Sequence, residues 1–264
     1  MRFAAASALA ALTLTITGCG GSDKEAADSP PAPPPSTTTQ AAAETMPPPV
    51  GGTGVGVYFV REDKLGYAAR TVGPTPKVAT AALGELLAGP TEADREAGLA
   101  TDIPPNTKLT SLAIANETAS VELSNPLDEL GTAQVVQTLL QFETVSRVEL
   151  AGRRYGPADV EPSLPAILVE SPAPGEKVAS PLRLTGTANT FEATFEVEVR
   201  PHVGKPLAAD FVTATSGSGT RGTFDKTLDF NVDRERSGSV VVFENSAEDG
   251  SVINRVEIPV VLTP

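Results

Sequence analysis

Hydrophobic residues take every second position in the first patterned part of the chain. Val55, Val57 and Phe59 alternate with other residues, and a second extended run covers 67–72. A period of two is typical of a β-strand that buries one face, so the two runs predict a β-hairpin.

The hydrophobic period then becomes that of a helix. Thr75 and Pro76 form a helix-start signal, Gly89-Pro90 is a stop signal, and the sequence between them predicts one amphipathic helix. A short capped turn is expected over 91–96, and a second amphipathic helix over 132–143. The apolar stripes are Val78, Ala82, Leu83, Leu86 and Leu87 in the first helix and Val135, Val136, Leu139, Leu140 and Phe142 in the second.

Three further strands complete this region. Segments 109–115 and 119–123 flank a polar turn at Asn116-Glu117, and 148–150 follows the second helix as a strand. The predicted order is ββαββαβ, an α+β domain over 55–155.

The rest of the chain shows only strand patterns. Glycines and prolines mark 156–165 as an interdomain linker, and short strands follow throughout 166–264. One run places Glu192, Glu196 and Glu198 on one face and Phe195 on the other. Seven such runs predict a β-sandwich, and they cover 167–170, 182–187, 192–199, 207–215, 222–230, 239–244 and 252–262.

The N-terminus carries an export signal. Arg2 precedes the apolar run 3–16, which is shorter than the about 20 residues needed to span a bilayer. Ile16-Thr17-Gly18-Cys19 ends this run and resembles the lipobox of bacterial lipoproteins. The resemblance implies that 1–18 is a signal peptide, and that acyl chains such as palmitate attach to Cys19 and hold the protein on the extracytoplasmic face of the cell membrane. The alternative is a free or buried thiol.

A proline-rich segment follows the predicted lipid site. Residues 19–54 contain proline clusters with Ala, Ser, Thr and Gly between them, a composition that does not build a core. We expect a disordered tether, which is either a stalk reaching up to roughly 100 Å or a spacer of no required length.

The net charge of the chain limits the classes of partner that it can bind. The chain has 20 Lys and Arg against 33 Asp and Glu, and loss of the signal peptide lowers the formal net charge from -13 to -14. Such an acidic protein is disfavoured as a partner of nucleic acid or anionic head groups. Cys19 is the only cysteine, so no intramolecular disulfide is expected and packing alone stabilises the fold.

Two family resemblances cover the folded regions. The first region contains the segments Leu86-Leu87-Ala88-Gly89-Pro90, Gly98-Leu99, Ile103-Pro104, Thr107-Lys108-Leu109, Ala119-Ser120-Val121-Glu122-Leu123-Ser124 and Gln137-Thr138-Leu139. The second contains Ser171-Pro172-Ala173-Pro174-Gly175, Thr185-Gly186-Thr187-Ala188, Gly222-Thr223-Phe224 and Glu248-Asp249-Gly250-Ser251. On these residues, 55–155 resembles the GerMN domain, which implies a role of the sporulation and germination type, and 166–263 resembles the immunoglobulin-like domain of bacterial spore germination. The first resemblance also implies envelope sensing, which GerMN domains accompany in actinobacterial lipoproteins.

Candidate chemistry is sparse. His202 is the sole histidine and has no apparent triad partner, and 216–219 lacks the nucleophile-elbow pattern. The glycines of 51–56 precede a strand rather than a helix, so they do not predict a phosphate site. Carboxylates at Asp225, Asp229, Asp233 and Glu235, and in the turn 248–251, do not match a calcium loop. We therefore expect no catalytic residue, cofactor or metal.

These observations favour a membrane-anchored envelope lipoprotein that binds another envelope protein without catalysis. One alternative is a module that binds cell-wall glycan through the sandwich loops or through Tyr58 and Tyr67. A second is a hydrolase using paired carboxylates, which requires a pocket with acids of perturbed pKa.

Overall fold

The computed structural model describes residues 51–264, which belong to one compact unit. The lipobox Ile16-Thr17-Gly18-Cys19, the signal peptide and all but the end of the predicted tether lie outside the described residues.

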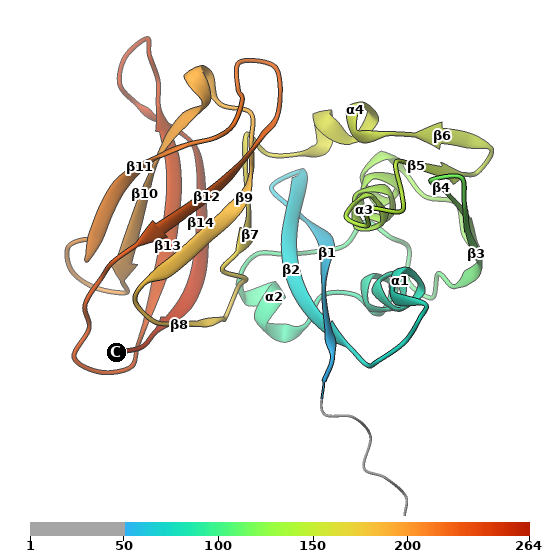
Figure 1. Ribbon diagram of the computed structural model, residues 1–264, viewed down its shortest axis with the longest axis horizontal. Helices are drawn as coiled ribbons and strands as arrows, with labels where there is room; N and C mark the ends of the chain where they lie inside the picture. The colour runs from blue at the N-terminus through green and yellow to red at the C-terminus, as the bar shows by residue number, and fades with distance from the viewer. Residues whose placement is uncertain (1–50) are drawn as a thin grey trace, which may run out of the picture. The chain divides into compact units, whose positions relative to one another are not determined.

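The first domain places two helices between a hairpin and a four-stranded sheet (Figure 1). The hairpin pairs β1 with β2, and the sheet has the order β3-β4-β5-β6, in which β4 and β5 are parallel. Side chains from all three layers form its core, including Phe59, Leu83, Leu139 and Val148. The elements are β1 Thr53–Arg61, β2 Lys64–Val72, α1 Val78–Ala88, α2 Glu92–Glu96, β3 Leu109–Ala115, β4 Thr118–Leu123, α3 Glu129–Leu140, β5 Arg147–Leu150 and β6 Arg153–Tyr155.

The predicted α+β order is confirmed, with β6 added at the end of the sheet. The predicted start of the first helix is wrong, because the Thr75 hydroxyl accepts the Lys77 N–H and α1 begins only at Val78. The second helix was predicted three residues too late at both ends, since the Asp128 carboxylate accepts the Gly131 N–H at 2.7 Å and caps α3 before Glu129. The first strand begins at Thr53, two residues inside the predicted tether.

Helix α3 covers the free edge of β1 with polar side chains. Gln134 donates to the Tyr58 carbonyl at 3.1 Å, and the Thr138 hydroxyl accepts the Tyr58 N–H at 3.3 Å. The Gln141 amide bonds both backbone groups of Gly56, at 2.8 and 2.7 Å. The edge of β1 is therefore paired with helix side chains at Gly56 and Tyr58, and with the backbone of Ala100 at Val60.

The second domain is a sandwich of a five-stranded sheet, ordered β11-β10-β13-β14-β8, and a three-stranded sheet, ordered β12-β9-β7 (Figure 1). Phe195 and Phe224 meet edge to face in its core with centroids 5.0 Å apart. Its strands are β7 Ile167–Ser171, β8 Lys177–Val178, β9 Leu182–Ala188, β10 Thr194–Pro201, β11 Ala208–Thr213, β12 Gly222–Leu228, β13 Arg236–Asn245 and β14 Val252–Leu262.

The predicted sandwich is confirmed, and β8 is added to the seven predicted strands. The alternation on β10 is confirmed for Phe195 and Glu196, but Glu192 lies in a 3₁₀ turn before the strand with φ of 54°. Between the domains, 156–165 contains the helix α4 (Pro157–Val160) and the 3₁₀ turn η1 (Glu161–Ser163). Val160 and Leu164 from this segment are buried in the core of the first domain.

Candidate functional site

Strand β7 belongs to two cores at once. Ile167 and Val169 point into the sandwich, whereas Leu168 between them is buried in the core of the first domain. Successive strand residues face opposite sides, so an uninterrupted apolar run suits a strand that is buried on both faces. This strand joins the two domains by packing as well as by chain connection.

A part-buried hydrogen bond also joins the two domains. The Tyr58 hydroxyl donates to Glu170 Oε1 at 2.8 Å, and Tyr67 packs edge to face on Tyr58 with centroids 5.6 Å apart. Burial raises the pKa of Tyr58 well above its usual value, and the Glu170 charge raises it further. Burial also raises the pKa of Glu170, although the bond from Tyr58 and the charge of Arg221 partly offset this.

The junction corrects one expectation from the sequence. Tyr58 is only 3% exposed, so the prediction that its ring could contact a sugar is wrong. Glu170 has a raised pKa, as a catalytic acid often does, but burial accounts for the rise, and the carboxylate already accepts a hydrogen bond from Tyr58.

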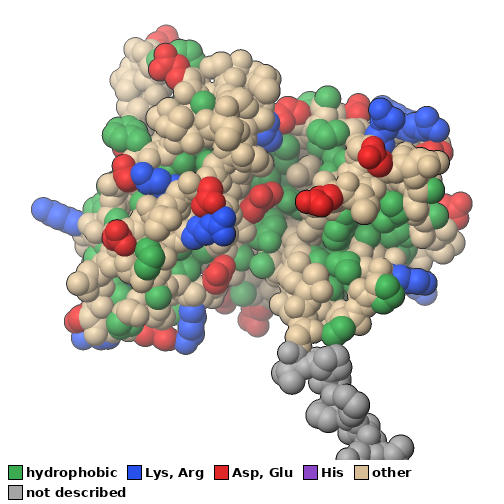
Figure 2. Space-filling model, in the orientation of Figure 1, with side chains coloured by type: hydrophobic (Ala, Val, Ile, Leu, Met, Phe, Trp, Pro, Cys, Tyr) green, Lys and Arg blue, Asp and Glu red, His purple; other side chains and the backbone are tan. Residues whose placement is uncertain are grey.

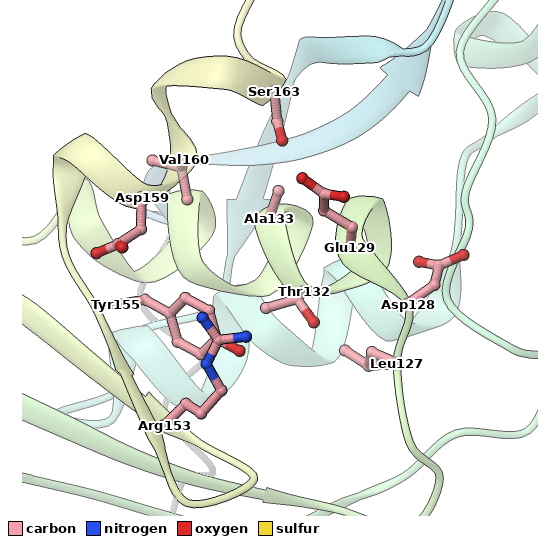
Figure 3. A pocket seen from close by; sticks show the side chains of 10 residues that line it. All are labelled: Leu127, Asp128, Glu129, Thr132, Ala133, Arg153, Tyr155, Asp159, Val160 and Ser163. Carbon is pink, nitrogen blue, oxygen red and sulfur yellow. The ribbon is translucent and has the colours of Figure 1, made fainter.

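A cleft of about 450 Å³ lies between the start of α3, strand β6 and helix α4 (Figure 3). The Arg153 guanidinium lies over the Tyr155 ring, 5.2 Å from its centroid. Asp128 and Glu129 lie at one end of the cleft and Asp159 at the other (Figure 3). Leu127, Thr132, Ala133, Val160 and Ser163 complete the lining.

Two of the three carboxylates in the cleft already accept hydrogen bonds from backbone N–H groups. Asp128 caps α3, and Asp159 Oδ2 accepts the Gly156 N–H at 2.7 Å ahead of α4. The side chains of Glu129 and Arg153 make no hydrogen bond within the described part of the chain, and both residues are exposed. The cleft therefore offers one charge of each sign beside an aromatic ring, which suits a polar ligand such as a sugar or a peptide.

A second exposed feature is the apolar tip of the sandwich, formed by Phe191, Val252 and Ile253. Their exposed fractions are 63%, 53% and 41%. The carboxylate of Glu244, itself buried, accepts the Phe191 N–H at 2.9 Å, and Glu244 pairs with Ile253 across β13 and β14. Glu244 thus links Phe191 to the strand position of Ile253 at one end of the five-stranded sheet, and Val252 lies next to Ile253 on the opposite face of β14.

The candidates considered from the sequence lie apart from these features. His202 is exposed in a bend and uses its backbone N–H to bond the Ser237 carbonyl at 3.1 Å. Asp225 pairs with Arg183 at 2.6 Å, Glu235 with Lys177 at 2.9 Å, and Asp233 with Arg236. Within 51–264, no cluster of three or more His, Cys, Asp or Glu side chains could hold a metal ion.

Sequence patterns did not reveal the cleft or the apolar tip. Arg153 and Tyr155 lie in a short hairpin strand without a recognised motif, and Phe191 lies in a turn directly before the run 192–199 that sequence alternation assigned to a strand. An isolated aromatic residue next to a turn is the only signal that could have indicated the tip, and such residues are common on protein surfaces.

No helix among residues 51–264 is long and apolar enough to cross a membrane.

Comparisons with known proteins agree with this architecture. Residues 56–151 match the family described as "Sporulation and spore germination", and residues 166–251 match the "Immunoglobulin-like domain of bacterial spore germination". No curated protein sequence matches the chain significantly.

Two solved structures illustrate the similarity. The tandem GerMN domains of the sporulation protein GerM from Bacillus subtilis are 21% identical over 41% of this chain and 42% of that chain, with a TM-score of 0.34. The chain thus spans less than half of the GerM structure. A candidate lipoprotein from Clostridium perfringens is 17% identical over 43% of this chain and 93% of that chain, with a TM-score of 0.27. Residues 56–151 therefore belong to the sporulation and spore germination (GerMN) domain family, and residues 166–251 belong to the immunoglobulin-like domain family of bacterial spore germination.

Proposed function

We propose that this protein is a lipid-anchored envelope lipoprotein that works without catalysis by binding another envelope protein during assembly or signalling. Cys19, behind Ile16-Thr17-Gly18, is the residue that carries the lipid on the extracytoplasmic face of the cell membrane. The two acyl chains of a diacylglycerol give durable anchoring, because each buried CH₂ contributes about 0.8 kcal/mol.

The apolar tip is the observation that carries the protein-binding proposal. Phe191 is 63% exposed although it is a large aromatic residue, and Val252 and Ile253 lie at the same end of the sheet. Exposed aromatic and aliphatic side chains that gather in one place commonly mark protein interfaces, where aromatic residues are enriched. Acidic surroundings, with a net charge of -13 for the chain, favour a partner with a basic rim around its apolar contact.

Site-specific photocrosslinking in cells tests this proposal. A photoreactive phenylalanine analogue at position 191 should crosslink one discrete envelope protein, identified by mass spectrometry. The same analogue at Val203, which is 83% exposed in a loop beyond the other end of β10, is the matched control and should not capture that protein. Cys19→Ala should move the protein out of the membrane fraction and remove the crosslink.

Two results would contradict the proposal. Equal capture from positions 191 and 203 would mean that the tip is not a specific contact. Retention of the Cys19→Ala variant in the membrane fraction would remove the anchor.

The cleft supports one alternative, a cell-wall glycan ligand. Tyr155 offers a ring beside Arg153 and Glu129, which replaces the buried Tyr58 as the candidate sugar contact. Sedimentation with purified cell wall distinguishes the alternatives. Binding that Tyr155→Ala abolishes and Phe191→Ser leaves unchanged would favour the glycan.

A further inference from the structure

Strand β3 is an edge strand without charged residues or prolines. It pairs only with β4, and its seven residues are Leu-Thr-Ser-Leu-Ala-Ile-Ala. Its pairing with β4 shifts register between Leu109 and Ser111, so the regular and open part of the edge is Ser111 to Ala115. Edge strands in soluble proteins usually carry charges or prolines, or are covered, because an open edge attracts another strand. Every other edge strand within 51–264 has a charged residue: Arg61 in β1, Lys64 and Arg70 in β2, Arg153 and Arg154 in β6, Glu170 in β7, Lys177 in β8, Asp210 in β11, and Asp225 and Lys226 in β12.

The edge strands β1 and β7 are also covered by neighbouring elements. Side chains of α3 bond the backbone of β1, and the first domain packs against β7. By contrast, five of the seven residues of β3 are exposed. The open edge of β3 is therefore a local feature and not a general property of this fold.

A groove of about 510 Å³ lies alongside β3, and its lining combines apolar residues with Lys77 and several Ser and Thr side chains. Leu112 and Ile114 pair with the buried Val121 and Ala119 of β4, so they point toward the helices and remain partly exposed at the edge. Val78 from the start of α1 and Phe142 line the opposite side of this groove. On the face shown in Figure 2, hydrophobic side chains gather over the part of the first domain where α1 lies.

We propose that β3 pairs antiparallel with β3 of a second copy of this chain, about a twofold axis at Leu112. In this register Leu112 faces itself and Ser111 faces Ala113 of the second copy, while Ile114 lies opposite the irregular step between Leu109 and Ser111 of the second copy. No residue of β3 is charged, so no charged residue of one strand faces a charged residue of the other. The result is one continuous eight-stranded sheet that crosses the two copies.

Charge at the ends of the strand selects this partner and this direction. Lys108 precedes β3, and Glu117 lies in the turn that follows Ala115. Antiparallel pairing centred on Leu112 brings the Lys108 end of β3 to the same side as the Asn116-Glu117 turn of the second copy, and the twofold axis repeats this attraction. Parallel pairing would instead place Lys108 beside Lys108 of the second copy. The neutral strand with opposite charges at its two ends is thus complementary to an inverted copy of itself.

A pair of charge designs on the exposed face of β3 tests the proposal. Ser111 and Ala113 are both exposed, and they face each other across the proposed axis. In a protein comprising residues 51–264, which belong to one compact unit, Ser111→Lys with Ala113→Lys places lysines opposite lysines. We expect this variant to dimerise at least about tenfold more weakly in sedimentation equilibrium. Ser111→Lys with Ala113→Glu places opposite charges together, and should dimerise as tightly as the original chain or more tightly.

The control adds the same two positive charges elsewhere. Thr71→Lys with Thr227→Lys changes exposed positions on β2 and β12 and should leave dimerisation unchanged. Circular dichroism melts confirm that each variant folds. The proposal is overturned if the original chain is monomeric up to about 1 mM. It is also overturned if the two β3 designs weaken the dimer equally, because self-pairing requires their opposite effects.

Discussion

At the scale of single residues, Asp94 shows how a buried carboxylate is held. It accepts the Thr91 N–H and the Thr91 hydroxyl, both at 2.7 Å, and it forms an ion pair with Arg70 of β2. Burial alone would raise the pKa of Asp94, but the hydrogen bonds from Arg70 and Thr91 outweigh burial and lower it. The capped turn expected at 91–96 is a helix that begins with a capping box, and the Asp94 of this box also links α2 to the hairpin through Arg70.

Asp94→Asn should lower the free energy of unfolding at pH 7 by about 2–4 kcal/mol, because Arg70 loses its buried partner. The folded-state pKa lies below the unfolded value of about 3.9, so the ionised carboxylate stabilises the fold above that pH and loses this effect as the pH falls through the folded-state pKa. The difference between the two proteins in urea titrations should therefore close below about pH 4.

Glu85→Gln is the matched control for this prediction. Glu85 lies 3.8 Å from Arg70 but its side chain is 42% exposed, so its loss should cost less than about 1 kcal/mol. An Asp94→Asn effect that stays constant from pH 7 to pH 3 would contradict the electrostatic explanation.

At the scale of elements, α3 combines an apolar stripe with a polar one. Gln134, Thr138 and Gln141 are spaced by four and three residues, so they lie on one face of the helix and follow the edge of β1. Gln134 is fully buried and also accepts the Asp102 N–H at 2.9 Å. These bonds satisfy backbone groups that would otherwise be buried without partners.

Gln134→Leu should therefore destabilise the protein by about 2–4 kcal/mol, although it exchanges a polar side chain for an apolar one in a core. The Tyr58 carbonyl and the Asp102 N–H would lose their bonds to Gln134. Thermal or urea unfolding measures the effect. Glu129→Ala, an exposed change in the first turn of the same helix, should cost under about 1 kcal/mol, and a neutral Gln134→Leu would refute the expected role of these bonds.

Helix α3 also shows which features of an element can be predicted from the sequence. Its apolar stripe predicted a helix in this region because residues on one face recur with a helical period. Its start was missed because Asp128 acts as the cap through a contact with Gly131, and many aspartates with similar neighbours do not cap helices. The polar stripe was missed because its partners are backbone groups some 80 residues away.

The candidate sites are harder to predict for the same reason. The cleft collects side chains from α3, β6 and α4, and the apolar tip joins Phe191 to strands β13 and β14. Periodicity describes one element at a time, so it assigns faces within an element but not the neighbours that those faces meet.

At the scale of the whole molecule, β7 couples the two domains. Leu168 and Val169 are adjacent in sequence and buried to a similar degree, yet they belong to different cores. All three tyrosines, Tyr58, Tyr67 and Tyr155, lie in the first domain, and the Tyr58 hydroxyl contacts Glu170 of β7. Tyrosine fluorescence therefore reports the first domain together with its junction to β7, and no tyrosine lies in the sandwich core.

Leu168→Ala should lower the urea midpoint of the tyrosine fluorescence transition, with a loss of about 2–4 kcal/mol, because it leaves a cavity in the first core. Val169→Ala should instead mainly reduce hydrogen-exchange protection of β9 and β10 in the sandwich core. If Val169→Ala lowers the tyrosine midpoint by more than Leu168→Ala, the two faces of β7 do not act separately.

Because β7 packs into the cores of both domains, it also limits where the chain can be divided to build chimeric proteins. A boundary drawn between 155 and 166 leaves Leu168 and Glu170 with the immunoglobulin-like domain, although their contacts are in the first. A transplanted second domain would therefore carry an apolar residue and a carboxylate that had lost their cover. A viable chimera has to keep the outward face of β7 together with Tyr58 and its neighbours, so the exchangeable unit in this chain is the domain pair.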